Sequence, residues 1–557
     1  MFVRLTKSKT SKNPTIQIAE SYREGKKVRQ RVIASLGVVR SDEDRERLIN
    51  VGHALINKLK EDSKAQLRFP GLEPASEESP KKKRGFINPK NLVHVRDVQC
   101  GFEDVYGALL EKVGFDGLLR EIDANSRRDF SVRDIIQLLV RRRLGEPVSK
   151  RRSLFLETLE TEVSPCELHQ VYRAMDAIEP YAEQFQKLAY NGATDLLHQK
   201  VECFFYDATT LYFESVLQDE VRDFGFGKDG KFNQVQCLFV LVVTEEGVPV
   251  AYEVFSGKTA ETSTFKTAIE NLSKRFNISK ITIVCDRAML SKQNLDFAEN
   301  EKNMYFIVGA KLRQLAKKHH DLIFDKSAYT RFGEVLLREV SHPTRKNCKL
   351  ILCFSEKRAK KDKQDRERLL TKLRAKMEKK KTSPEDFISN KGVKKYIEIS
   401  GGGTVTLSSE AIAREEKWDG FFGVVTNHLS LPSTHVLYHY RGLWQVEATF
   451  RISKHELRTR PIFHWSPHRI KTHVLLCFIA LVLERHLEVI LKQRKTPLTI
   501  TNILDALRKC KRIIVQDQAS HRLFEMDSNK PAEAKIIQGK FIVASRMSLV
   551  EDLANKN

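Results

Sequence analysis

The chain has 557 residues, a hydrophobic content of 41% and a formal net charge of +24 at pH 7. This length is typical of three or four domains, and the charge indicates a polyanionic partner: nucleic acid first, an anionic membrane surface as the rival. The longest apolar run, residues 474–483, is too short to span a bilayer, and the N-terminal residues lack the apolar core of a signal peptide. Nine cysteines without a CxxC pair indicate buried free thiols in a reducing compartment and argue against zinc.

The N-terminal third is strongly basic. Residues 1–70 predict a small β-rich unit with a hairpin at 23–26, which is either a DNA-contacting arm or a solvated hairpin. Residues 71–96 have the composition of a linker. Residues 97–197 are expected to be mostly helical and carry arginine clusters, which favours either a DNA-binding region or a helical bundle with a solvated basic face.

The stretch 201–215, VECFFYDATTLYFES, is apolar on both faces of a strand, which is typical of a buried central strand. Asp207 lies in its middle. An ionised carboxylate there has a high desolvation cost unless a cation meets it, either an Arg or Lys side chain or a metal ion. Residues 234–243 and 248–255 predict two further strands, which complete a three-stranded antiparallel meander.

A second acid follows the next predicted strand. Residues 280–285, KITIVC, end at Asp286, and a helix is expected to begin near residue 291. A carboxylate at the carboxyl end of a buried strand lies where α/β sheets usually carry their sites. The alternative is a helix cap or an ordinary loop acid.

Residues 311–420 interrupt the α/β alternation and are interpreted as an insertion with strand-like pieces and a long charged helix. The alternation returns with a strand at 421–426 and ends with an apolar helix at 469–491, expected to pack on the sheet. Residues 497–557 suggest a small appended helix and strand pair.

Residues 437–458 predict one helix that carries a third acid. Residues seven apart share one helical face, with a drift of roughly 20° per step. On this face lie Tyr440, Glu447 and Lys454. The alternative for Glu447 is a surface ion pair with Arg451 at i,i+4. Trp444 is expected to pack in the core.

These elements follow the order of a ribonuclease-H-like fold: an acid in a central strand, hairpin strands, a helix, a strand ending in an acid, an insertion, a strand and an acid-bearing helix. The segments FFYDATTLYFES, GVPVAYEVFSGKTAETSTF, IVCDRAMLS, WDGFFGVVTN and YRGLWQVEATFRISK resemble successive blocks of bacterial insertion-sequence transposases of the DDE class. The subgroup resembled has a β-rich insertion between the second Asp and the Glu. GKKVRQRVIASLG and RIKTHVLLCFIALVLER also resemble it, so the resemblance covers most of the chain.

The resemblance implies an α/β protein whose ribonuclease-H-like catalytic core carries the β-rich insertion and is preceded by N-terminal β-rich and helical DNA-binding regions. The core then occupies residues 198–310 and 421–495, the insertion 311–420, and a C-terminal region 496–557.

The resemblance also implies the site residues. The catalytic and metal-binding triad falls on Asp207, Asp286 and Glu447. The subgroup's Tyr-Arg-Glu-Lys signature falls on Tyr440, Glu447 and Lys454, with Leu443 in place of the arginine. The residues expected to contact DNA are Tyr440, Lys454, Arg451 and Arg441.

The implied chemistry is in-line phosphodiester cleavage and strand transfer with two Mg²⁺ ions about 4 Å apart, for which Mn²⁺ substitutes. The implied partners are double-stranded DNA, both the inverted-repeat ends of the element and the target, and a second copy of the chain in a homodimeric synaptic complex. Cut-and-paste movement, a cytoplasmic, nucleoid-associated location and no membrane partner complete the expectation. Two alternatives stay open: a ribonuclease-H-like nuclease without strand transfer, and a catalytically inactive DNA-binding protein.

Overall fold

The computed structural model describes most of the chain in two compact units, Met1–Ala174 with Leu487–Asn557, and Met175–His486. The described residues are 2–6, 14–24, 27–39, 42, 45–46, 48–53, 56, 89–161, 164–199, 202–225, 234–278, 280–287, 291–378, 393–399, 405–496, 498–528 and 530–538. All nine cysteines are free thiols, and all but Cys166 are buried.

The first unit begins with an antiparallel sheet of β1 (Phe2–Thr6), β2 (Thr15–Glu24) and β3 (Lys27–Val38). The pairing of Glu24 with Lys27 closes a hairpin where the sequence predicts one, and residues 25–26 of its turn lie outside the described residues. The core of this part contains Ile16, Ile18 and Leu36.

The rest of the first unit is mainly helical, with a second small sheet of order β17-β16-β4. Its longer elements are β4 (Leu92–Gln99), α2 (Ala108–Val113), α3 (Phe115–Ala124), α4 (Val132–Gly145), α5 (Lys150–Thr161), α16 (Ile500–Arg508), β16 (Lys511–Asp517), β17 (Leu523–Asp527) and α17 (Ala532–Gln538), and α6 (Leu168–Ile178) begins in it. The predicted linker 71–96 therefore ends in a strand. Its partner β16 lies at the other end of the chain, which the local composition does not reveal.

One predicted basic patch is buried. Arg142 on α4 is only 8% exposed and pairs with Glu157 and Glu160 of α5, at 2.7 Å in each case. Arg141 also pairs with Glu157, at 2.5 Å. These arginines join two helices, so this part of the cluster is neither a solvated face nor a surface for phosphate.

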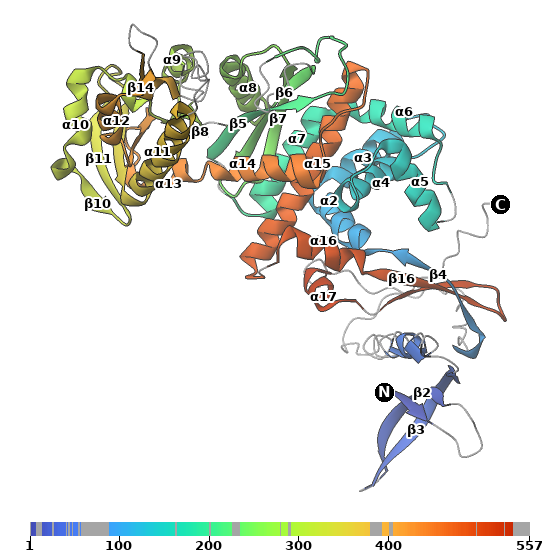
Figure 1. Cartoon of the computed structure of the whole chain (residues 1–557). Coiled ribbons are helices and arrows are strands. Elements are labelled where there is room, and N and C mark those ends of the chain that lie inside the picture. The colour runs from blue at the N-terminus through green and yellow to red at the C-terminus, as the bar shows by residue number, and fades with distance from the viewer. Residues whose placement is uncertain are drawn as a thin grey trace, which may run out of the picture. The chain divides into compact units, whose positions relative to one another are not determined.

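The second unit is a mixed α/β structure built on one large sheet (Figure 1). Its strands are β5 (Cys203–Tyr212), β6 (Gln236–Thr244), β7 (Pro249–Ser256), β8 (Ile281–Cys285), β9 (Met304–Gly309), β10 (Thr330–Phe332), β11 (Val335–Ser341), β12 (Lys349–Ser355) and β15 (Phe421–Thr426), with a separate pair β13 (Ile397–Ile399) and β14 (Val405–Leu407). Its longer helices are α7 (Ala182–Asn191), α8 (Glu261–Phe276), α9 (Lys292–Asn300), α10 (His320–Phe324), α11 (Glu356–Met377), α12 (Ser409–Glu416), α13 (Ser433–Arg441), α14 (Trp444–Arg451) and α15 (Pro467–Gln493).

The strand order of the large sheet is β10-β11-β12-β15-β9-β8-β5-β6-β7. β5 pairs antiparallel with β6, and β6 with β7, so the predicted meander is confirmed. On its other side β5 pairs in parallel with β8, and β8 in parallel with β9. Three strands from the predicted insertion, β10 to β12, extend the same sheet beyond β15.

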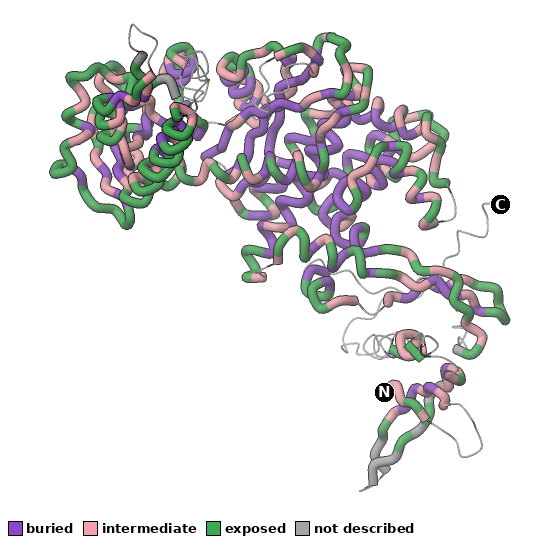
Figure 2. Tube along the Cα trace, viewed as in Figure 1, coloured by how far each residue is buried: buried purple, intermediate pink, exposed green. Residues whose placement is uncertain are grey.

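Helices cover both faces of the central strands. On one face, the Tyr206 ring lies 5.5 Å from the Phe265 ring of α8. On the other face, the Phe239 and Phe450 rings lie 5.8 Å apart, which seats α14 on β6. Figure 2 shows the buried residues concentrated in these strands and in α15. Helix α15 confirms the helix predicted at residues 469–491. No helix among the described residues is long and apolar enough to cross a membrane.

The contact of α15 with the sheet is expected to contribute to the free energy of unfolding. Phe478 is 1% exposed, and its ring lies 4.9 Å from that of Tyr252 on β7. Phe478→Ala should lower the free energy of unfolding of this unit by about 3–5 kcal/mol through lost burial and the cavity left behind. Urea unfolding followed by near-ultraviolet circular dichroism measures this. Phe332→Ala, at a position 48% exposed, is the control and should change it by no more than about 0.5 kcal/mol. Equal losses in the two variants would contradict the packing.

Candidate active site

Asp207 lies in the middle of β5, the central strand of the second unit. It is half-buried, and its Oδ1 accepts a hydrogen bond of 2.8 Å from the backbone N–H of Ala208. Because side chains alternate along a strand, Phe205, Asp207 and Thr209 share one face. This is the face opposite to Tyr206 and α8.

Asp286 directly follows β8, and the strand register places it beside Asp207. Tyr206 pairs with Cys285 in the parallel β5–β8 ladder, so the two aspartates are the next residues along neighbouring strands. Burial raises the pKa of the Cys285 thiol, and the carboxylates of Asp286 and Asp207 raise it further, so both charges lie near this one side chain. Asp286 is exposed, and its Oδ1 accepts a 2.6 Å hydrogen bond from the N–H of Arg287.

Glu447 lies on α14, and the helix that carries it differs from the prediction. The sequence predicts one helix over 437–458, whereas the structure has α13, a break at Gly442 and Leu443, α14 and a short π-helix η11 (Ile452–Glu456). The break lies against β5. A Cβ atom at Gly442 would lie 2.6 Å from Cζ of Phe205, so the absence of a side chain permits this approach.

The far end of this helical segment also contacts β5. The half-buried Lys454 donates a short hydrogen bond from Nζ to Oγ1 of Thr209. Gly442 thus contacts Phe205, and Lys454 contacts Thr209. Phe205 and Thr209 are the neighbours of Asp207 on the same face of β5. Glu447 lies between these anchor points in the chain and is exposed. Among the described residues no ion pair joins Glu447 to Arg451, so the alternative of a surface ion pair is not supported.

Tyr440 lies on the other side of this arrangement, near β9. A Cβ atom at Gly309 would lie 2.5 Å from the Tyr440 hydroxyl oxygen. Burial raises the pKa of Tyr440, and the Asp286 carboxylate raises it further. The same Cβ position at Gly309 lies 3.3 Å from Cβ of Arg287, the residue that follows Asp286. Tyr440 therefore lies at β9 and Lys454 at β5, with the break at Gly442 and Leu443 between them in the chain.

The remaining predicted residues lie further out. Arg441 and Arg451 are both exposed, and the charge of Arg441 influences the pKa of Cys353 on β12. Leu443, in the signature's arginine position, is half-buried. The core packing expected for Trp444 is wrong: its side chain is 58% exposed, because the buried face of α14 is formed by Val446, Thr449 and Phe450.

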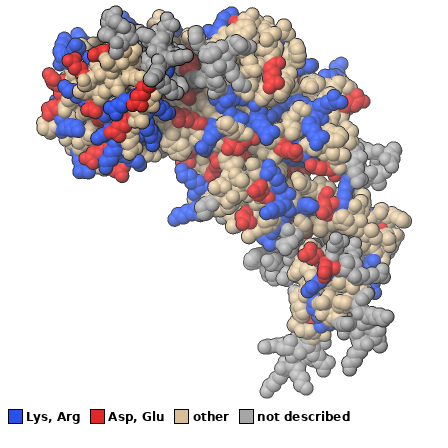
Figure 3. All heavy atoms as spheres, in the orientation of Figure 1, with Lys and Arg blue, Asp and Glu red and all other residues tan. Residues whose placement is uncertain are grey.

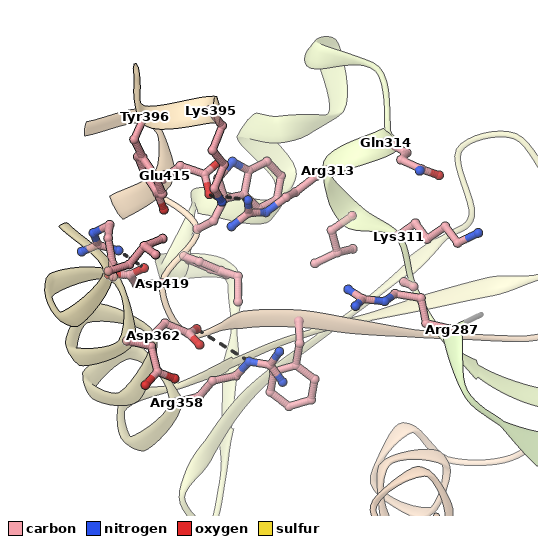
Figure 4. A pocket seen from close by; sticks show the side chains of 18 residues that line it. Arg287, Lys311, Arg313, Gln314, Arg358, Asp362, Lys395, Tyr396, Glu415 and Asp419 are labelled. Atoms are coloured by element: carbon pink, nitrogen blue, oxygen red, sulfur yellow. Dashed lines mark hydrogen bonds and ion pairs between the residues drawn. The ribbon is translucent and has the colours of Figure 1, made fainter. Parts of the chain in front are cut away.

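Sequence reasoning missed a large pocket beside Asp286. Its volume is about 660 Å³, and its walls include Arg287, Lys311, Arg358 and Trp418 (Figure 4). Some wall charges pair with each other, as Arg313 does with Glu415 at 2.6 Å and Arg366 with Asp419 at 2.5 Å. The position of Arg287 directly after the second acid was the one available signal, because the other wall residues come from segments distant in the sequence.

The donor atoms of the three acids are of the type that a hard divalent cation takes, but their carboxylate oxygens do not all lie within 4.8 Å of one another. Asp207, Asp286 and Glu447 offer only carboxylate oxygens, the ligands that Mg²⁺ and Mn²⁺ take. Asp286 and Glu447 are exposed, so ions and substrate can approach from solvent.

Comparisons with known proteins identify the family of the chain. Residues 199–483, more than half of the chain, match the family of the transposase DDE domain, and residues 3–67 match the N-terminal domain of IS1634 family transposases. Among solved structures, the chain is similar to the piggyBac transposase synaptic complex with hairpin DNA, at 9% identity and a TM-score of 0.35, covering 74% of this chain and 80% of that one. No curated protein matches significantly. The chain belongs to the family of transposases with a DDE domain.

Proposed function

We propose that this transposase binds the inverted-repeat ends of an insertion sequence, cleaves them and joins them to target DNA at a site formed by Asp207, Asp286 and Glu447. The observation that carries the proposal is the packing of the segment α13 to η11 on β5. Gly442 contacts Phe205 and Lys454 contacts Thr209, the two residues on either side of Asp207 on its face of β5. The β5–β8 register places Asp286 next to Asp207.

The three carboxylates would hold two Mg²⁺ ions, with Mn²⁺ as a substitute. When bound, such ions stabilise negative charge on the attacking and leaving oxygens of an in-line displacement at phosphorus. Asp207 from the centre of the sheet, Asp286 from the end of β8 and Glu447 from α14 would supply the carboxylate ligands.

The residues around the acids would hold DNA. Lys454 provides a cation beside Asp207, and Tyr440 provides a phenol that stays protonated at neutral pH, because its pKa is raised from a value already near 10. A neutral hydroxyl can donate a hydrogen bond to a phosphate oxygen without charge repulsion. Arg441 and Arg451 are exposed on the same helical segment and would contact phosphates further along the strand.

The proposed core is ribonuclease-H-like, comprising residues 198–310 and 421–495. Its support is the strand order β7-β6-β5-β8-β9, with acids on β5, after β8 and on the helix that follows β15. The segment 311–420 between the second and third acids is the proposed insertion, and it adds β10 to β12 to the same sheet.

The rest of the chain would serve DNA binding and assembly. Residues 1–70 and 97–197 are the proposed DNA-binding regions, and two copies of the chain would hold the two element ends in one homodimeric complex. Figure 3 shows Lys and Arg side chains dispersed over the viewed surface of both units, so the charge of +24 provides a broad attraction to phosphate. A cytoplasmic, nucleoid-associated location follows from this substrate.

Replacing the acids tests the chemistry. Asp207→Asn and Asp286→Asn should each lower end cleavage by a factor on the order of 10²–10⁴, since several kcal/mol of transition-state stabilisation are lost. Binding of end DNA in a mobility-shift assay should remain, and the Mn²⁺ bound at saturation, measured by electron paramagnetic resonance, should fall. Glu301→Gln, an exposed acid before β9, is the control. Cleavage by Asp207→Asn at the control rate would contradict the assignment.

The same assay separates the transposase from a simple nuclease. With end DNA, a target plasmid and Mg²⁺, the wild-type chain should give joined products as well as free ends. Free ends without joined products would favour a nuclease, and bound but uncut DNA would favour a DNA-binding protein.

Lys454 tests the phosphate contact. Lys454→Gln should weaken binding of end DNA and reduce the slope of log affinity against log salt by about 1, which is the change expected for one lost phosphate contact. Lys302→Gln, an exposed lysine in the turn before β9, should leave the slope unchanged. Equal slopes for wild type and Lys454→Gln, measured by fluorescence anisotropy over a salt series, would exclude the contact.

Gly442 tests the seating of the helical segment. Gly442→Ala should displace the segment from Phe205 and lower the cleavage rate by about 10–10² fold, because small misplacements of reacting groups are costly. DNA affinity should change little. Gly117→Ala on α3, where an added Cβ meets nothing within 4 Å, is the matched control. Single-turnover cleavage of pre-bound DNA measures the effect, and an unchanged rate would show that the close approach is dispensable.

A further inference from the structure

A second group of potential metal ligands lies at the start of β5. Cys203 is the first residue of this strand, Glu245 follows β6, and His439 lies in the last turn of α13. One ligand atom from each residue lies within 4.8 Å of the others. The pairing of Phe204 with Thr244 explains half of this geometry, since it places Cys203 opposite Glu245.

Contacts outside the group hold these ligands in place. Arg485 donates hydrogen bonds to the carbonyl oxygens of Glu246, at 2.7 Å, and Gly247, at 2.9 Å, which fixes the turn that carries Glu245. Thr449 of α14 donates a further one of 3.0 Å to Gly247. Ligands positioned by their own elements lose little freedom when an ion binds.

The His439 ring is oriented toward the group but is poorly satisfied there. Its Nδ1 lies 3.2 Å from Oε1 of Glu245, yet this buried nitrogen makes no hydrogen bond. The side chain of His439 is 17% exposed and Cys203 is 4% exposed, so solvent access is limited. A buried nitrogen without a hydrogen bond is unfavourable, and an ion between the three ligand atoms would remove this penalty.

The donor atoms distinguish this group from the acids of the proposed catalytic site. Sulfur, imidazole nitrogen and carboxylate oxygen together form a ligand set for zinc, whereas Mg²⁺ takes oxygen donors. Three protein ligands leave a fourth tetrahedral position, and Glu245, 35% exposed, lies on the side open to solvent. Asp207 lies four residue steps along the strand from Cys203, a distance of about 13 Å, so the two groups cannot share an ion.

We propose that Cys203, Glu245 and His439 bind one Zn²⁺ ion that fixes the end of α13 to the start of β5. His439 directly precedes Tyr440, and α13 leads through Gly442 into the helix of Glu447. The ion is therefore a positioning element for the helical segment, distinct from the ions proposed at Asp207. This inference goes beyond the proposed function, and the zinc site can be tested without any DNA reaction.

Cobalt is the probe, because Co²⁺ replaces zinc and reports its ligands by absorption. The full-length chain, stripped of metal with a chelator, should bind one equivalent of Co²⁺ and develop a thiolate-to-cobalt band in the near ultraviolet together with visible bands of tetrahedral geometry. Stoichiometric Zn²⁺ should abolish both, while excess Mg²⁺ should not. Metal analysis after dialysis against micromolar zinc should give one zinc ion per chain, and zinc should raise Tm.

Variants assign the ligands. Cys203→Ser should lose the ultraviolet band, and Glu245→Gln and His439→Ala should each weaken zinc binding by more than about 100-fold, beyond the effect of losing an outer hydrogen-bond partner. Cys237→Ser, at an equally buried cysteine on β6, should keep the band. Asp207→Asn should also keep it, which separates this site from the catalytic proposal. If Cys203→Ser does not fold, the other two variants, which retain the thiol, decide the matter. A wild-type chain without the ultraviolet band, or a band that survives in Cys203→Ser, overturns the proposal.

Discussion

The parallel pairing of β5 with β8 is the interaction on which the candidate site depends. It matches Tyr206 with Cys285, so the residues that follow, Asp207 and Asp286, reach the same level of the sheet. β8 ends there while β5 continues to Tyr212, which leaves one acid within a buried strand and the other at an exposed strand end. A slip of one residue would turn Asp207 to the face covered by α8, where it would meet Phe265 instead of solvent and helix α14.

The third acid, Glu447, is placed by the packing of a helix on the sheet and not by strand pairing. The helical segment after β15 is interrupted at Gly442, and this glycine permits contact with the Phe205 ring. The interrupted segment brings Tyr440 to β9 and Lys454 to β5. In the proposed function, these two side chains would contact different phosphates of one DNA strand.

The sequence predicts the elements whose signal is local. The apolar faces of β5, the β6–β7 pair and α15 are continuous in the sequence, and Asp207 and Asp286 are conspicuous because each interrupts or ends such a run. Long-range pairing leaves no comparable local signal. The joining of β10–β12 to the core sheet, the pairing of β4 with β16 and the burial of Arg142 against Glu157 all depend on partners distant in the chain. The sequence also did not predict the break at Gly442, because the surrounding residues favour a helix. Only the contact with the Phe205 ring shows why a glycine is needed there.

The proposed zinc ligands Cys203, Glu245 and His439 come from three different elements. A zinc site built in this way would leave no CxxC pattern in the sequence. The two groups on this face of β5 differ in donor chemistry, all oxygen at Asp207 and mixed sulfur, nitrogen and oxygen at Cys203, so the two proposed sites would favour different metals. The same helical segment carries His439 and Glu447. An ion at the Cys203 group would restrict α13 before DNA binds. Less conformational entropy would then be lost when Glu447 becomes ordered for metal binding and cleavage.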